Sequence, residues 1–193
     1  MAPRNLYRWL KWRFFQWDIG NEPVHMIRPN LANIPQCALP DGYQLRPYQA
    51  GDEHHWREIH LKADTLNLFP PEMFAQQFGN DTAVLQARQF YLINPQDEVV
   101  GTASAWWDDE VWGKVHWVAI VPEEQGRGLA KPLLTAVLNT LQNLGHKKAK
   151  LETGSGRLPA VNLYLSYGFE PDVKSDYDAF VWRVVKFQLR NGR

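Results

Sequence analysis

The chain has 193 residues, 45% of them hydrophobic and 22% charged, and its 21 basic side chains are balanced by 21 acidic ones. These values predict one soluble domain with a packed core. The zero formal charge argues against nucleic acid as a partner, because tight binding by counterion release needs a positive field. Cys37 is the only cysteine, which excludes an internal disulfide framework or a cysteine metal cluster and indicates a reducing, cytoplasmic environment.

The N-terminal part differs in character from the rest of the chain. We interpret residues 1–40 as an aromatic and basic arm followed by a proline-rich strap, and residues 41–193 as the folded domain. Trp9, Trp12 and Trp17 are crowded into the arm, which we expect to pack on the domain or on a partner subunit. Attachment to a membrane surface is the alternative. No apolar run reaches the roughly 18 residues of a membrane span, and basic residues interrupt the arm, so neither a span nor an export signal is expected.

Helical and strand patterns follow each other along the domain. The expected elements of its first half are a strand at 42–47, a helix opening at 51–52, a second helix between 70 and 79, and antiparallel strands at 89–94, 99–107 and 114–121. Those of its second half are a helix with an apolar stripe from 129 to 144, a strand at 149–153, a helix at 159–167 and a last strand at 179–189.

The segment 115–130, with the sequence V-H-W-V-A-I-V-P-E-E-Q-G-R-G-L-A, is the most informative part of the chain. A β-branched run leads there through a glycine-bearing turn into a helix. Gly126 and Gly128 allow a tight turn whose backbone N–H groups point the same way, and the following helix adds its positive N-terminal dipole. This layout predicts a cradle for an anion such as a pyrophosphate.

Other phosphate-binding patterns do not fit this turn. A Walker A loop requires Lys and then Ser or Thr after its last glycine, whereas Leu129 follows Gly128. A dinucleotide fingerprint requires a third glycine, and Lys131 stands at that position. The pair Gly154 and Gly156 fails in the same way.

A third interpretation fits better and involves a second motif. Residues 125–130, Q-G-R-G-L-A, match [Q/R]-x-x-G-x-[G/A], and residues 160–169, A-V-N-L-Y-L-S-Y-G-F, match A-[IV]-x-L-Y-x-x-x-G-F. At this spacing the motifs together resemble those of the GCN5-related N-acetyltransferase (GNAT) superfamily, over the chain from Tyr43 to the C-terminus. The resemblance implies an α/β (α+β) fold, with a mixed, mostly antiparallel central sheet that is splayed at the acetyl-coenzyme A site and flanked by helices.

The resemblance also implies where acetyl-coenzyme A, the acetyl donor, would bind. The pyrophosphate would take the backbone N–H groups of the glycine turn, and the pantetheine arm would pair with the main chain of the preceding strand. The family often has Asn where this chain has Arg157, whose guanidinium could still reach a phosphate or pantetheine oxygen. The implied donor-binding residues are Val118, Ala119, Ile120, Gln125, Gly126, Arg127, Gly128, Leu129, Ala130, Arg157 and Asn162.

Tyr164 stands where this family commonly places the residue that protonates the departing thiolate. A phenol with a pKa near ~10 is a suitable donor to a thiolate whose conjugate acid has a pKa near ~8.5. A packed aromatic residue on a short helix is the alternative interpretation.

The general base is less well defined by the sequence. His116 is the first candidate, because it lies on the strand before the turn, where related enzymes place bases, and because histidine titrates near neutral pH. Strand alternation predicts that it shares a face with Val118 and Ile120, opposite Trp117. Glu152 on the neighbouring strand is the second candidate, and a water chain without a dedicated base is the third. The alternative interpretation of His116 is a partly buried histidine with a structural role.

Two further features bear on ligands. Trp106, Trp107 and Trp112 surround the acids at 108–110, a combination that could hold a cationic amine, although a solvated hairpin end explains it as well. The histidines at 54 and 55 lack partners at metal-ligand spacing, so no metal is expected.

The sequence therefore predicts an acyltransferase enzyme, an N-acetyltransferase that transfers the acetyl group of acetyl-coenzyme A to a primary amine by direct nucleophilic attack. The acceptor, a small-molecule amine or a peptide or protein amine, stays open, and so does a homodimer. The alternative is a non-catalytic acyl-coenzyme A-binding sensor or structural module of the same fold. Such a module would need the cradle but neither Tyr164 nor His116.

Overall fold

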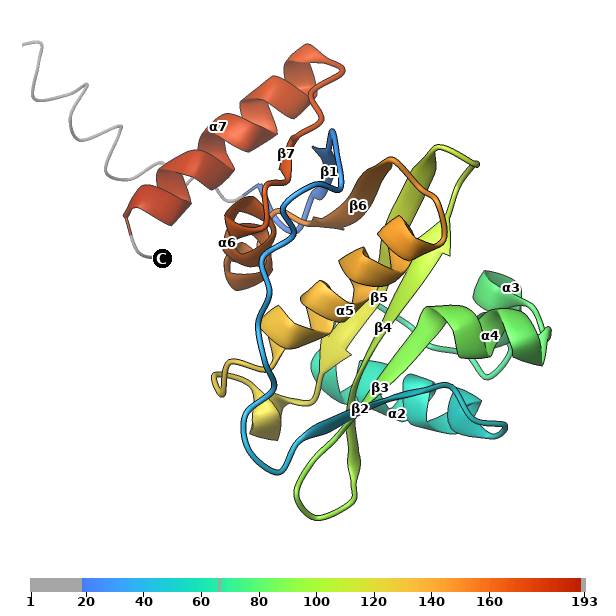
Figure 1. Cartoon of the computed structure of the whole chain (residues 1–193). Helices are drawn as coiled ribbons and strands as arrows, with labels where there is room; N and C mark the ends of the chain where they lie inside the picture. Colours follow the sequence, from blue (N-terminus) through green and yellow to red (C-terminus); the bar gives the residue numbers. More distant parts are fainter. Residues whose placement is uncertain (1–18, 66, 192–193) are drawn as a thin grey trace, which may run out of the picture.

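Seven strands form one sheet, in the order β2-β3-β4-β5-β6-β1-β7, in the computed structural model, which describes residues 19–65 and 67–191 (Figure 1). Neighbouring strands are antiparallel except β5 and β6, which are parallel. This mixed, mostly antiparallel sheet confirms the predicted fold class. The strands are β1 (Pro23–Arg28), β2 (Gln44–Pro47), β3 (Gln89–Ile93), β4 (Val99–Trp107), β5 (Trp112–Ile120), β6 (Lys148–Gly154) and β7 (Glu170–Pro171).

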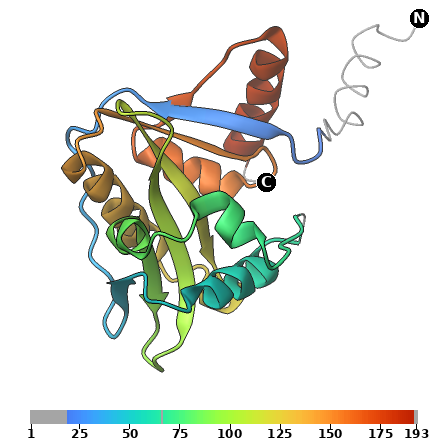
Figure 2. The same cartoon turned by 90° about the vertical axis from the view of Figure 1, so that its right-hand side faces the viewer.

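Helices cover both faces of the sheet. The helix α5 (Ala130–Asn143) packs on one face of β3, β4 and β5, and α2 (Asp52–Ala63) packs on the other face of β4 and β5 (Figure 2). The apolar stripe predicted for α5 is buried up to Leu141, whereas Leu144 at its end is 42% exposed. The core on the α2 side is built mainly from aromatic rings. The remaining helices are α3 (Met73–Phe78), α4 (Thr82–Arg88), the 3-10 turn η1 (Pro122–Glu124), α6 (Leu158–Ser166) and α7 (Asp176–Arg190).

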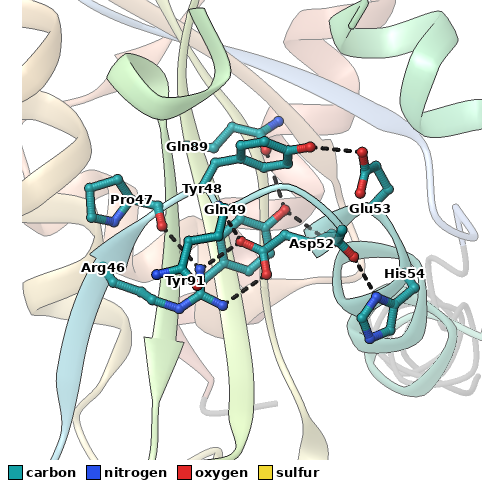
Figure 3. Close-up of polar contacts among 10 residues, drawn as sticks. Arg46, Pro47, Tyr48, Gln49, Asp52, Glu53, His54, Gln89 and Tyr91 are labelled. Atoms are coloured by element: carbon teal, nitrogen blue, oxygen red, sulfur yellow. Dashed lines mark hydrogen bonds and ion pairs between the residues drawn. The ribbon is translucent and has the colours of Figure 1, made fainter. Parts of the chain in front are cut away.

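The N-terminal end of α2 is fixed to the edge of the sheet by a buried ion pair (Figure 3). Asp52, which is 3% exposed, accepts hydrogen bonds from Arg46 Nη1 and Nη2 at 2.6 and 2.8 Å and from the backbone N–H of Gln49 at 2.6 Å. Tyr48 donates to Glu53 in the same helical turn at 2.7 Å. A carboxylate in the first turn also suits the helix dipole, so α2 starts from a defined position beside β2.

The strands β5 and β6 pair only at one end. Residues 112–114 of β5 pair with residues 148–150 of β6, and the pairing stops there. On its other edge β5 continues to pair with β4 as far as Ile120, and β6 pairs with β1 as far as Gly154. The second half of β5 therefore has no strand partner on the β6 side within the described chain, which is the predicted splay.

A bulge interrupts β5 at its centre. Ser104 of β4 lies opposite His116 while Thr102 lies opposite Ala119, so that one more residue stands on β5 than on β4 between these pairs. Trp117 lies in the bulge and has a φ of 49°, in the left-handed region. The alternation predicted for this strand is therefore wrong. The side chains of His116 and Trp117 are not on opposite faces, because both contact the same glutamine of α3.

The strand β1 lies in the segment that we interpreted as a strap with little periodicity. Val24 and Met26 are buried in alternation with more exposed neighbours, and the strand pairs with residues 149–154 of β6. The short alternation escaped detection because prolines stand at or beside both of its ends.

The expected boundary at residue 41 stays a prediction, although β1 shares one sheet with strands from beyond it. The aromatic arm falls on residues 1–18, which lie outside the described residues. Within the described residues no helix combines the length and the apolar character that a membrane crossing requires.

The last strand expected from the sequence is wrong, since the segment 179–189 belongs to α7. Ser175 caps this helix by accepting a hydrogen bond from the backbone N–H of Asp178 at 3.1 Å. Val181, Val184 and Val185 are buried at helical spacing. This packing favours the helix although valine has a high β propensity. The helix α4, which begins after Asp81, was not predicted either.

Candidate functional site

The turn between η1 and α5 contains the two glycines of the predicted anion cradle and is open around them. Gly126 and Gly128 have φ values of +78° and +80°, and a Cβ atom added at either glycine would meet nothing within 4 Å. The backbone N–H groups at the start of α5, next to this open space, have no acceptor within the helix. An open turn at a helix N-terminus fits a diphosphate group.

Gln125 shapes the turn from inside. Its side-chain amide donates to the backbone carbonyl of Ile120 at 2.9 Å, and its backbone N–H donates to the carbonyl of Pro122 at 3.2 Å. The end of β5 is thereby tied to the start of the turn. The N–H of Gln125 is already used, so the backbone donors left toward an anion are those of Gly126, Arg127, Gly128, Leu129 and Ala130.

The side chain of Arg127 is held beside the turn by a network of its own. Its Nε lies 3.3 Å from Glu124 Oε2, and its Nη1 donates to the hydroxyl of Tyr43 at 3.3 Å. Tyr43 in turn donates to Glu124 at 2.6 Å, and Glu124 is buried. Arg127 is therefore paired within the protein, and the cradle presents backbone groups rather than a free cation.

The free edge of β5 leads directly to this turn. Val118 and Ala119 are half-buried, and Ile120 is buried. These residues follow the bulge and lie where β5 has separated from β6. Their main chain is placed to pair with an extended group that enters between the two strands.

Tyr164 lies on α6 and is 7% exposed, with its ring against the edge of Phe169 at a centroid distance of 5.9 Å. Burial raises the pKa of Tyr164 to about 12, so its hydroxyl carries a proton at neutral pH. Among the described residues its hydroxyl has no hydrogen-bond partner, unlike that of Tyr167, which contacts Thr135 and Lys131. Tyr164 therefore has a proton to donate.

Arg157 and Asn162, the other candidates from the second motif, have different surroundings. Arg157 is the N-cap residue of α6 and donates to Asp64 Oδ2 at 2.6 Å, while its charge opposes the rise in the pKa of Tyr164. Asn162 is exposed on α6. No motif in the sequence singled out Asp64, because its partner Arg157 stands 93 residues away along the chain.

His60 of α2 lies near the Arg157–Asp64 pair, whose charges act on it, and reaches toward β5. It is 3% exposed, and burial lowers its pKa to about 3, with a smaller opposing effect from Asp64. Its ring lies 5.1 Å from the ring of Trp117, between centroids. The Arg157–Asp64 pair thus joins α6 to the end of α2, and His60 of α2 lies beside Trp117 at the bulge in β5.

His116 stands beside the bulge and is half-buried. Burial, with a smaller contribution from Lys114, lowers the pKa of His116 to about 3. The imidazole is therefore neutral at pH 7, and the expectation that it titrates near neutral pH is wrong. Its Nε2 lies 3.1 Å from Gln77 Oε1, and the ring of Phe78 is 5.6 Å away. The structure therefore places His116 on the α2 and α3 side of the sheet, beside the group that contains His60.

Glu152, the second candidate base, lies apart from this group. Its carboxylate is 59% exposed and lies 3.6 Å from His25 Nδ1 on β1. Within residues 19–65 and 67–191, no hydrogen bond or ion pair connects it to His116 or Tyr164.

The protein's own cations already lie against the aromatic hairpin end that could have held a cationic amine. Arg88 lies 4.2 Å from the ring centre of Trp107, and Lys148 lies 5.2 Å from that of Trp112. Lys150 pairs with Asp108. In the part of the chain that the structure describes, no cluster of His, Cys, Asp and Glu side chains could hold a metal ion.

Comparisons with known proteins agree with this architecture. The model of the acetyltransferase (GNAT) family matches residues 48–169. Among solved structures, a GCN5-related N-acetyltransferase from Sphaerobacter thermophilus superimposes with a TM-score of 0.64 at 20% identity, over 89% of this chain and 54% of that one. The ribosomal-protein-S18-alanine N-acetyltransferase from Escherichia coli superimposes with a TM-score of 0.55 at 20% identity, over 65% of this chain and 76% of that one.

The curated relatives include mycothiol acetyltransferases. The protein from Pseudarthrobacter chlorophenolicus is 30% identical over an alignment of 150 positions, which covers 72% of this chain and 46% of the relative. That from Actinosynnema mirum is 29% identical over an alignment of 153 positions, which covers 75% of this chain and 50% of the relative. The chain thus spans about half the length of the curated relatives it matches. Since the family model covers more than half of its residues, the chain belongs to the acetyltransferase (GNAT) family.

Proposed function

We propose that this chain is an N-acetyltransferase that uses acetyl-coenzyme A and transfers the acetyl group directly to a primary amine. The observation that carries the proposal is the continuity of the site. The unpaired half of β5 runs into the open glycine turn at the start of α5, with the buried phenol of Tyr164 on α6 after β6.

In this proposal the diphosphate of the donor lies on the backbone N–H groups from Gly126 to Ala130, and the pantetheine arm pairs with the main chain of residues 118–120. Gln125 holds strand and turn together through its bonds to the carbonyls at 120 and 122. Asn162 is exposed on α6 and can contact the donor. Arg157 is bonded to Asp64, so it contacts the donor either with its remaining N–H groups or after this bond breaks.

The chemistry requires one C–N bond to form and one C–S bond to break. The amine nitrogen attacks the thioester carbonyl and gives a tetrahedral intermediate, and its proton passes to His116 or to water. The departing sulfur takes a proton from the hydroxyl of Tyr164, whose raised pKa keeps that proton available. We assign the base to His116 rather than Glu152, because the contacts of Glu152 lead to His25 on β1.

We place the acceptor on the α2 and α3 side of β5, where half-buried His116 is neutral and lies beside the rings of Phe78 and Trp117. The name of the curated relatives makes a mycothiol-related amine one acceptor to examine. Small metabolite amines, peptide N-termini and protein lysines are the other classes.

Release of coenzyme A thiol, measured with acetyl-coenzyme A and a panel of amines, tests the proposal. An N-acetyltransferase releases thiol at a rate that depends on the amine and yields the acetylated amine in equal amount. A non-catalytic acyl-coenzyme A-binding module binds the donor but releases no thiol with any amine class. The Tyr164→Phe variant should bind the donor and lose turnover.

A further inference from the structure

Gln77 of α3 contacts both residues that meet at the bulge of β5. Trp117 Nε1 donates to Gln77 Oε1 at 3.0 Å, and His116 Nε2 lies 3.1 Å from the same oxygen. The two rings are neighbours, with 5.5 Å between their centroids. They reach one acceptor because Trp117 has a φ of 49° and breaks the strand alternation.

The indole of Trp117 fixes the orientation of the Gln77 amide. An indole N–H can only donate a hydrogen bond, so the amide atom that faces it has to be the carbonyl oxygen and not the NH₂ group. The same oxygen faces His116 Nε2. Since an oxygen of this kind can only accept, Nε2 has to carry the hydrogen.

We infer that Gln77 is a positioning residue that holds His116 in its Nε2–H tautomer and leaves Nδ1 as the ring atom that accepts the proton of the amine. A neutral imidazole carries one hydrogen, so the donor bond at Nε2 leaves the lone pair on Nδ1. The use of Nδ1 in catalysis rests on the proposed function, whereas the tautomer itself does not.

The other groups around His116 do not supply this control. Lys114 of β5 lowers the pKa of His116 through its charge, His60 of α2 adds to this only when it is protonated, and Asp108, which follows β4, opposes both. Phe78 of α3 presents only a ring. Among the described residues, the hydrogen bond of the His116 ring is the one to Gln77.

The tautomer can be read without turnover, from the nitrogen chemical shifts of the whole chain labelled with ¹⁵N-histidine. The unmodified protein should show His116 as the Nε2–H form. Gln77→Met removes the acceptor and should give a mixture of both tautomers. Gln76→Met is the matched control, since its side chain is exposed on the same helix, and should leave the spectrum of His116 unchanged. An Nδ1–H form in the unmodified protein, or no change in Gln77→Met, would overturn the inference.

Gln77→Glu provides a second test with an isosteric side chain. A carboxylate at this distance stabilises the imidazolium and should raise the pKa of His116 by about one unit or more. An unmoved pKa in a folded variant would show that the residue at 77 does not face Nε2.

The catalytic part is tested by steady-state kinetics. Gln77→Met should lower kcat about tenfold while the KM for acetyl-coenzyme A stays unchanged. A changed tautomer with unchanged kcat would overturn the positioning role. If neither the unmodified protein nor any variant shows turnover, the result counts against the proposed function and not against the tautomer.

Discussion

Arg157 Nη2 lies 2.6 Å from Asp64 Oδ2, and this ion pair joins the N-cap of α6 to the C-cap of α2. The helix α6 follows β6, whereas α2 packs on β4 and β5, so the pair connects the elements on either side of the splay. The side chain of Asp64 is 8% exposed and that of Arg157 is 40% exposed. A carboxylate buried to this degree depends on its donors.

Arg157→Ala should therefore destabilise the protein, because it removes the cation from the buried Asp64 carboxylate. We expect a loss of roughly 1–2 kcal/mol in the free energy of unfolding, less than for a fully buried pair, since Arg157 is partly in solvent. Denaturant titration measures this loss. Lys174→Ala is the control, since it removes an ion pair to Asp172 whose lysine is largely in solvent, and it should cost clearly less. Equal losses in the two variants would contradict a structural role for the Asp64 pair.

Tyr164→Phe removes only a hydroxyl and keeps the ring packing against Phe169. If Tyr164 protonates the leaving thiolate, kcat should fall on the order of 10²-fold while the affinity for coenzyme A holds. Tyr167→Phe is the matched control, because its hydroxyl bonds to Thr135 and to the Lys131 carbonyl inside the core. That variant should have a lower Tm and keep its kcat. A retained kcat with a changed Tm in Tyr164→Phe would make Tyr164 a packing residue.

Two histidines with lowered pKa values, His60 and His116, make stability depend on pH. Burial lowers the pKa of both His60 and His116 to about 3. The unfolded chain binds these protons with a pKa near ~6.5, so it is favoured increasingly as the pH falls below that value, by up to ~1.4 kcal/mol per pH unit and histidine. The full stability is present above ~6.5 and declines toward pH 3.

Urea unfolding between neutral pH and about pH 5 measures this decline. His60→Phe removes one titrating group and keeps an aromatic ring, and should make the decline shallower. The unmodified protein is the reference. The same slope in the two proteins would show that His60 does not control the decline. The low pKa of His116 also predicts that any pH–rate limb between ~6 and 7 belongs to the substrate amine.

The sequence predicted the features that depend on local chemistry. The glycine turn after β5 follows from the backbone freedom of Gly126 and Gly128, and the stripe on α5 follows from its helical spacing. The mixed, mostly antiparallel sheet and its splay were predicted from the resemblance to the family, and the structure confirms both.

What the sequence did not predict depends on contacts between distant segments. The segment at 179–189 has the composition of a strand, but packing of Val181 and Val185 makes it a helix. The bulge at Trp117 has no local signal, since it arises from the register between β4 and β5. Asp64 was not predicted either, because its partner Arg157 is brought to it only by the fold.

Calorimetric titration of acetyl-coenzyme A into the unmodified protein, Gly128→Val and Gly145→Val tests the central claim most directly. Gly128 and Gly145 have φ values of +80° and +92° and open space where a Cβ atom would stand, so both substitutions carry similar backbone strain. Only the side chain at 128 enters the cradle. We predict an affinity at least tenfold weaker for Gly128→Val, about 1.4 kcal/mol, and an unchanged affinity for Gly145→Val. Equal affinities of the three folded proteins would contradict a donor site at the glycine turn.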